Sequence, residues 1–210
     1  MPTLVKSIPS QNITLLYDKL DLSPEGIDRT RLRQIGGPKA AVMDTDEMIV
    51  VIQPLSTTIL QLGDRRIRVT IQKPEKEVGK IPFWVTAHQL HELVKERSKL
   101  EAYGFNYDIE VETAGDGAAI LQNLFVPDKA LLESKITGKL LAISPRLKYE
   151  RNNIRYDLNL EPGEGNNVKA HLNAHKETHE LPPQNVLERD YKNVFAEFSE
   201  TLTRLLEVSQ

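Results

Sequence analysis

The sequence predicts an α+β fold, in which a mainly antiparallel β-sheet of hairpins and a meander is packed by a mid-chain helix and a long C-terminal amphipathic helix. Two observations carry this prediction. Apolar and polar residues alternate with a period of two over many short segments, and turn residues separate these segments. After residue 183 the apolar period changes to that of a helix. We expect eight or more strands in one domain, residues 1–210.

The first part of the chain is expected to form one short helix and several strands. Residues 13–22 fit a strand or a short amphipathic element. Ser23 and Pro24 have the features of a helix cap and a first helical residue, so we expect a helix from there to about Ile35. Gly63-Asp64 predicts a hairpin turn. Strands are expected at 40–43, 48–52, 57–62 and 66–71.

The mid-chain helix is expected to begin at Thr86, because Thr86 and Gln89 have the spacing of a capping box. Its apolar residues recur at helical spacing until Gly104, which we expect to end it. From Phe105 the period returns to two, which predicts a strand and then a hairpin partner at 119–126. Pro127-Asp128 is expected to open a brief helix.

Residues 139–179 are expected to form a β-meander with one dry face and one wet face. A helix of 24 residues is then predicted at 184–207, about 36 Å long. It is longer than many small domains need to cover a sheet, so we expect part of it to pack on another chain. Its apolar stripe consists of Leu187, Tyr191, Val194, Phe195, Phe198, Leu202, Leu205 and Leu206.

Two segments of the chain have weakly similar sequences, which raises the hypothesis of an internal duplication with halves at about 40–104 and 105–210. Ile52-Gln53-Pro54 resembles Ile143-Ser144-Pro145, and each is followed by a hairpin. Ile67-Arg68 and Ile154-Arg155 occupy similar places in the two segments. The spacings between these matching residues differ by about four residues in the two segments, so the similarity is weak.

Composition limits the function classes. The formal net charge is −3, which provides no general attraction to nucleic acid or to an anionic membrane. No apolar run approaches the roughly 18 residues of a membrane span. The absence of cysteine excludes disulfides, thiol nucleophiles and cysteine zinc sites. We therefore expect a cytoplasmic protein with no membrane partner.

His171, His175 and His179 are the strongest candidates for a metal site, because they recur every four residues. On a helix they would share one side and could bind zinc or another divalent transition metal. The alternation instead predicts a strand, on which the outer two are too far apart for one ion. The three histidines could then converge on one metal ion only if the chain turned after His175. The competing interpretation is that these histidines are solvated side chains on the wet face, with no cofactor.

Three other groups offer weaker candidates. His88 and His91 could join the histidine site only if their helix packed beside the meander. The acidic turn at 44–47 could hold magnesium, but such turns are more often solvated caps. Arg66 and Arg68 share one face of a predicted strand and are the best argument for nucleic acid. No aromatic residues are interleaved with them, so nucleic acid is not the favoured partner.

The sequence contains no glycine-rich phosphate loop, no Gly-x-Ser-x-Gly elbow and no His-Glu-x-x-His helix. The first hypothesis is therefore a non-enzymatic binding or assembly protein that contacts a protein partner or a second copy of itself. We expect the contact to use sheet edges and the C-terminal helix, and a homodimer is one of the two arrangements that this allows. The alternatives are a histidine-based metal protein or metal-dependent enzyme, and a nucleic-acid-binding protein that uses Arg66 and Arg68.

Overall fold

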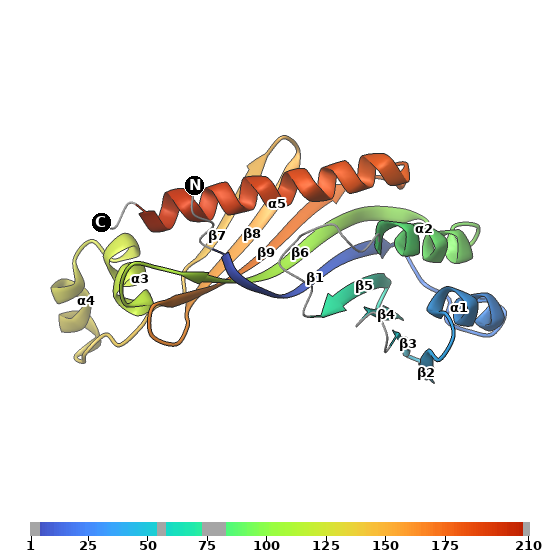
Figure 1. Ribbon diagram of the computed structural model, residues 1–210, viewed down its shortest axis with the longest axis horizontal. Helices are drawn as coiled ribbons and strands as arrows, with labels where there is room; N and C mark the ends of the chain where they lie inside the picture. The colour runs from blue at the N-terminus through green and yellow to red at the C-terminus, as the bar shows by residue number, and fades with distance from the viewer. Residues whose placement is uncertain (1–4, 54–57, 73–82, 208–210) are drawn as a thin grey trace.

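The computed structural model describes residues 5–53, 58–72 and 83–207. In this part of the chain, one continuous antiparallel sheet has the strand order β2-β3-β4-β5-β1-β6-β9-β8-β7, which confirms the α+β prediction (Figure 1). The long strands β1 and β6 pair at its centre. The strands are β1 (Val5–Tyr17), β2 (Ala41–Asp44), β3 (Met48–Gln53), β4 (Thr58–Gly63), β5 (Arg66–Gln72), β6 (Leu100–Glu112), β7 (Arg146–Arg151), β8 (Ile154–Pro162) and β9 (Asn167–Glu177).

Two main helices pack on the same face of the sheet (Figure 1). α2 contacts β5 and β1, α5 contacts β6, and the two helices contact each other. α1 packs against α2 and β3, while α3 contacts β8 and β9 at one end. None of the described helices is both long and apolar enough to cross a membrane. The helices are α1 (Arg29–Gly36), α2 (Phe83–Val94), α3 (Gly117–Phe125), α4 (Lys129–Ile136) and α5 (Gln184–Glu207).

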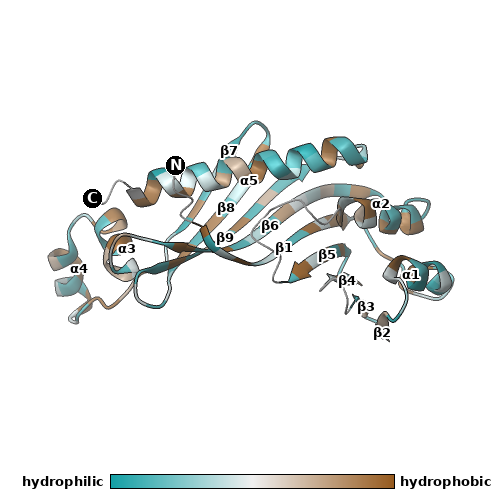
Figure 2. Ribbon diagram, viewed as in Figure 1, coloured by the Kyte–Doolittle hydropathy of each residue, from teal (hydrophilic) through white to brown (hydrophobic). Residues whose placement is uncertain are grey.

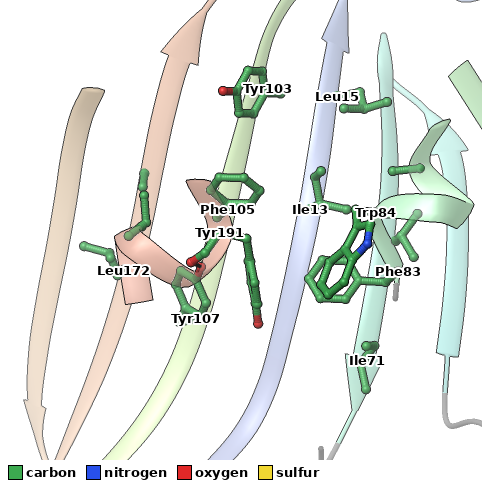
Figure 3. Close-up of a cluster of buried hydrophobic side chains, with 14 of the residues drawn as sticks. Ile13, Leu15, Ile71, Phe83, Trp84, Tyr103, Phe105, Tyr107, Leu172 and Tyr191 are labelled. Atoms are coloured by element: carbon green, nitrogen blue, oxygen red, sulfur yellow. Dashed lines mark hydrogen bonds between the residues drawn. The ribbon is translucent and has the colours of Figure 1, made fainter. Parts of the chain in front are cut away.

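The core between sheet and helices is centred on Tyr191 of α5 (Figure 3). Its ring meets Phe83 edge-on at 4.8 Å between ring centres and stacks on Tyr107 at 5.1 Å. The Tyr107 hydroxyl donates a hydrogen bond of 2.8 Å to the Tyr191 carbonyl oxygen. The Tyr191 hydroxyl donates to Oε1 of Gln11 on β1. α5 is therefore fixed to the two central strands by both packing and hydrogen bonds.

The C-terminal helix has the predicted bounds, and its apolar stripe lies against the protein's own sheet. Phe195 and Leu205 are partly buried at the margin of the stripe. The outward side of α5 is largely hydrophilic (Figure 2). The stripe that motivated a helix-mediated dimer is thus occupied within the chain. Its fully buried members are Leu187, Tyr191, Val194, Phe198, Leu202 and Leu206.

The predicted meander and the predicted hairpin at Gly63-Asp64 are confirmed. β7, β8 and β9 pair consecutively as antiparallel strands. In the hairpin between β4 and β5, Asp64 and Arg65 have φ of +45° and +58°. Two consecutive positive values are typical of the tight turn whose twist matches that of the flanking strands.

Three local predictions were wrong at their boundaries or in their type. The first helix begins at Arg29 rather than near Ser23, because the Asp28 carboxylate accepts the amide hydrogens that start the helix. The mid-chain helix ends at Val94, and Leu100 begins strand β6 instead of continuing the helix. Residues 119–126 were predicted as a strand, but they lie mainly in helix α3, which Asp116 caps.

The strand order shows a similar arrangement of elements in the two halves of the chain. Each half starts with a long central strand, β1 or β6, passes through helical segments and outer strands, and returns with β5 or β9 beside that central strand. A helix on the same face follows, α2 in the first half and α5 in the second. By this order the counterpart of β5 is β9.

Candidate functional site: the open face of the sheet

We use the name open face for the side of the sheet opposite α2 and α5. Residues on this side alternate with the buried residues of each strand, as in β1, where Ile13 and Leu15 are buried and Asn12 and Thr14 are partly exposed. On the four central strands the open-face residues include Ser10, Asn12 and Thr14 of β1, Arg66, Arg68 and Thr70 of β5, Gly104, Asn106 and Asp108 of β6, and His171, Asn173 and His175 of β9.

Three asparagines form a row across the middle of the open face. Asn12, Asn106 and Asn173 are direct cross-strand neighbours on β1, β6 and β9. The Nδ2 of Asn106 donates a 2.8 Å hydrogen bond to Oδ1 of Asn12, and its side chain is buried among these neighbours. Uncharged amides can both donate and accept hydrogen bonds. This row therefore offers a preformed surface for a polar backbone or side chain.

His171 lies beside this row in a chain of hydrogen bonds. Its Nδ1 is 2.6 Å from Oδ1 of Asp108, the residue directly opposite on β6. The other carboxylate oxygen of Asp108 accepts from the Ser10 hydroxyl. The hydrogen bond to Asp108 raises the pKa of His171, and the same bond lowers the pKa of Asp108. Because the aspartate lies between the serine and the histidine, the arrangement does not activate Ser10 as a nucleophile.

A cavity of about 480 Å³ opens beside this pair. Its polar lining includes Asp108, Asn159, Lys169 and His171, which come from three neighbouring strands. The lining mixes donors, acceptors and charges of both signs. Glu110 and Glu161 also line the cavity, so its acidic side chains outnumber its basic ones, and the lining favours a polar or positively charged group.

His175 occupies the same face of β9 but has different surroundings. Its cross-strand neighbours are Gly104 on β6 and Arg155 on β8. Burial against these strands lowers its pKa, which is the opposite of the effect at His171. Arg155 is held by Glu177, with 2.8 Å between Nη1 and Oε1.

Opposite charges are paired on the outer part of the open face. Arg146 on β7 and Asp157 on β8 form a two-pronged ion pair, in which Nε lies 2.7 Å from Oδ1. The hydrogen bond from Arg146 lowers the pKa of Asp157. Pairing of this kind leaves little net field to attract a polyanion.

The opposite end of the open face is apolar. On β2 and β3, Met43 and Ile52 are 53% and 45% exposed. Met48, Val50 and Ile59 lie around them on β3 and β4 and are partly exposed. Exposed apolar side chains grouped beside polar ones are typical of a protein-binding surface.

The structure does not bring the three predicted metal ligands together. His171 and His175 lie on the open face, but His179 follows the end of β9, and its Nδ1 donates to the Leu100 carbonyl oxygen at 3.2 Å. Residues 5–53, 58–72 and 83–207 contain no group of three or more His, Cys, Asp or Glu side chains that could hold a metal ion. β9 continues past His175 to Glu177, and His179 lies beyond its end against Leu100, away from the open face.

His179 instead lines a cleft with His88 and His91 at the end of the sheet. The cleft has a volume of about 630 Å³. His88 donates from Nε2 to the Pro182 carbonyl oxygen at 2.7 Å, and the hydroxyl of Tyr17 lies 2.9 Å from Nδ1 of His91. Burial lowers the pKa of His91. Each histidine thus has a structural partner, which explains its position without a ligand.

Arg66 and Arg68 share the open face of β5, as their spacing predicted. Nε of Arg68 donates to the Thr14 hydroxyl at 3.3 Å, and Arg66 lies 3.6 Å from Asp64.

In the acidic turn, Asp44 is bound by Arg29 through a two-pronged ion pair, with 2.6 Å between Nε and Oδ2.

Sequence reasoning missed Ser10, Asn12 and Asp108 as members of one surface. Ser10 and Asp108 are 98 positions apart, so their contact depends on the pairing of β1 with β6. The alternation identified the wet face of β9, but nothing local identified its neighbours. No protein-family model and no curated protein matches this chain.

Proposed function

We propose that this protein is a non-enzymatic binding or assembly protein that acts through protein–protein contacts, and that the open face is its main binding surface. The observation that carries the proposal is that, in the described part of the chain, the two main helices cover the same face of the sheet. α2 and α5 pack on one face, while the other presents an asparagine row, paired charges and an apolar end. A surface with these three parts fits a folded protein partner better than a small molecule. The lack of cysteine fits a cytoplasmic location.

The chemistry of the open face favours a protein over a nucleic acid. Several of its charges are paired with opposite charges, as at Arg146 and Asp157 and at Arg155 and Glu177, and none of its described strand positions carries an aromatic side chain. Single-stranded nucleic acids are usually bound by a positive groove combined with aromatic stacking. On the open face, much of the positive charge is balanced by acidic side chains, and the described strands contribute no aromatic side chain.

Affinity capture with matched variants tests the proposal. Asn173→Glu adds a charge at the centre of the open face, and Asn193→Glu makes the same change on the exposed side of α5. With extract of the source cells, the wild type and Asn193→Glu should retain the same protein, and Asn173→Glu should lose it. Equal retention by all three would contradict the assignment of the open face.

A polyanion partner is the second candidate, because Arg66 and Arg68 stand together on β5 beside the central row. It predicts salt-sensitive retention on heparin that falls when both residues are replaced by alanine. Arg65→Ala is the matched control, since Arg65 lies in the turn and pairs with Glu101 at 3.9 Å. The absence of retention at low salt would end this alternative.

A further inference from the structure

Strand β2 ends the sheet on its apolar side, and its surroundings differ sharply from those of the opposite edge. Among the described strands only β3 pairs with β2. Met43 of β2 is 53% exposed on the open face, next to Val50 and diagonal to Ile52 of β3. Figure 1 shows β2 at the extremity of the sheet. Unpaired strand edges with exposed apolar side chains are templates for pairing with another chain.

The other edge is protected by charge. β7 has the sequence RLKYER, and four of its six residues are charged. Charged side chains on an edge strand oppose edge-to-edge pairing, because pairing would bury or oppose them. The two edges are thus not equivalent, and β2 is the one suited to association.

The charges around β2 are complementary to those of a second, antiparallel copy. Lys39 precedes the strand, and Asp46 and Glu47 follow it in the turn to β3. All three are exposed, and none forms an ion pair within the described part of the chain. In an antiparallel pair of β2 strands, the lysine end of each copy meets the acidic end of the other.

We infer that a second copy of this chain pairs with the β2 edge about a twofold axis, which continues the sheet across the two copies. Residues directly opposite in an antiparallel pair point to the same face. Pairing centred on Met43 therefore sets Met43 against Met43 of the second copy on the open face. Lys39 and the acidic turn lie beyond the two ends of β2, so the same register brings Lys39 of each copy towards the acidic turn of the other. This inference goes beyond the proposed open-face contact, because it concerns the edge of the sheet and names its partner.

A cysteine placed at the twofold axis tests the register directly, since the natural chain contains no cysteine. Directly opposite residues in an antiparallel pair have Cα atoms about 4.5–5.5 Å apart, which suits a disulfide. Met43→Cys should form a covalent dimer under mild oxidation. Leu141→Cys, at a position that is 76% exposed elsewhere on the molecule, is the control and should stay monomeric on a denaturing gel.

Charge reversal tests the contact without touching the core. Light scattering over a concentration series should show a dimer for the wild type. Lys39→Glu, and separately Asp46→Lys with Glu47→Lys, should each weaken dimerisation by about tenfold, because each change acts twice across a twofold axis. Combining all three changes should restore the dimer.

A wild-type protein that stays monomeric at all concentrations would overturn the inference. So would a dimer that is indifferent to the charge reversals, or equal cross-linking of the two cysteine variants. The two proposals fail separately, because Asn173→Glu should remain dimeric, while Lys39→Glu should still capture the open-face partner.

Discussion

His171 and His175 show how two residues on the same strand and face acquire opposite properties. The alternation predicted that both lie on the wet face of β9, and both do. Their chemistry is set by the neighbouring strand β6, which places Asp108 opposite His171 and Gly104 opposite His175. Asp108 lies 63 positions before His171. The face could therefore be predicted from the sequence, whereas the direction of each pKa shift required the strand register.

A titration of the imidazole signals by NMR should separate these two histidines. The pKa of His171 should lie above the ordinary value of about 6.5, and that of His175 below it. Asp108→Asn should lower the pKa of His171 and leave that of His175 unchanged, because Asp108 does not pair with His175. Coinciding titrations of the two residues would show that the register of β6 and β9 is wrong.

The pair also predicts a pH dependence of stability. A histidine whose pKa is raised by folding contributes stability in full below about pH 6.5, and this contribution is lost as pH rises through its folded-state pKa. Asp108 has a lowered pKa, so its contribution is present above about pH 4 and is lost as pH falls through the folded-state value.

The stabilising effect of Asp108 over Asp108→Asn should therefore be largest between about pH 4 and pH 6.5. Because both side chains are about half exposed, the difference should not exceed about 1 kcal/mol. Denaturant unfolding of both proteins across this range measures it. A difference that grows steadily above pH 8 would contradict the assignment.

At the scale of elements, the local sequence pattern was sufficient to predict a helix or strand where the apolar residues of a long segment recur with one constant period. α5 has the predicted bounds, and the meander forms as three consecutive strands. They failed at residues 119–126, where the apolar sequence fits a strand or a helix equally well. Asp116 decides the outcome, because its carboxylate accepts the amide hydrogen of Ala119 at 2.8 Å and starts a helix.

The position of α3 depends on a close contact at Gly117. A Cβ atom there would clash with the carbonyl oxygen of Asn167, at the start of β9. Gly117→Ala should therefore destabilise the protein by about 1–3 kcal/mol, because the helix must shift from the sheet. Gly115→Ala is the control, since its added Cβ would meet no atom within 4 Å from the described residues other than its chain neighbours. Denaturant unfolding should show equal effects only if α3 does not pack on β9.

The attachment of α5 depends mainly on Tyr191. This fully buried residue contacts aromatic rings of α2 and β6 and donates to Gln11 of β1. Tyr191→Ala should lower the free energy of unfolding by about 3–5 kcal/mol, the usual cost of removing a large buried ring. Asn193→Ala, two residues away on the exposed side, should change it by less than about 0.5 kcal/mol. A small effect at Tyr191 would contradict the packing of α5 on the sheet.

At the scale of the whole molecule, the strand order aligns the two halves of the chain differently from the weak internal sequence similarity. The sequence similarity matched Ile67-Arg68 of β5 with Ile154-Arg155 of β8. By strand order, however, the counterpart of β5 is β9. We propose repeat units that begin at β1 and β6. Strand order is a long-range property, because β1 pairs with strands far along the chain, so short matches in one sequence could not identify it.

The packing of α2 and α5 on the same face of the sheet also changes where association is expected. The sequence pointed to sheet edges and to the C-terminal helix, and the helix was included because a stripe of apolar residues spans its whole length. In the folded protein that stripe is occupied by the chain's own core, and the exposed apolar residues Met43 and Ile52 lie at the β2 end of the open face. The burial of an amphipathic face is satisfied equally by a sheet of the same chain or by a partner, and the sequence alone does not distinguish them.

Site-specific photocross-linking tests the binding role of the open face most directly. A photoreactive amino acid at position 173 places the probe in the asparagine row, and the same probe at position 193 lies on the exposed side of α5. In extract of the source cells, the probe at 173 should form a discrete product with one partner protein, and the probe at 193 should not. Cross-linking at 193 but not at 173, or no product at either position, would contradict the account.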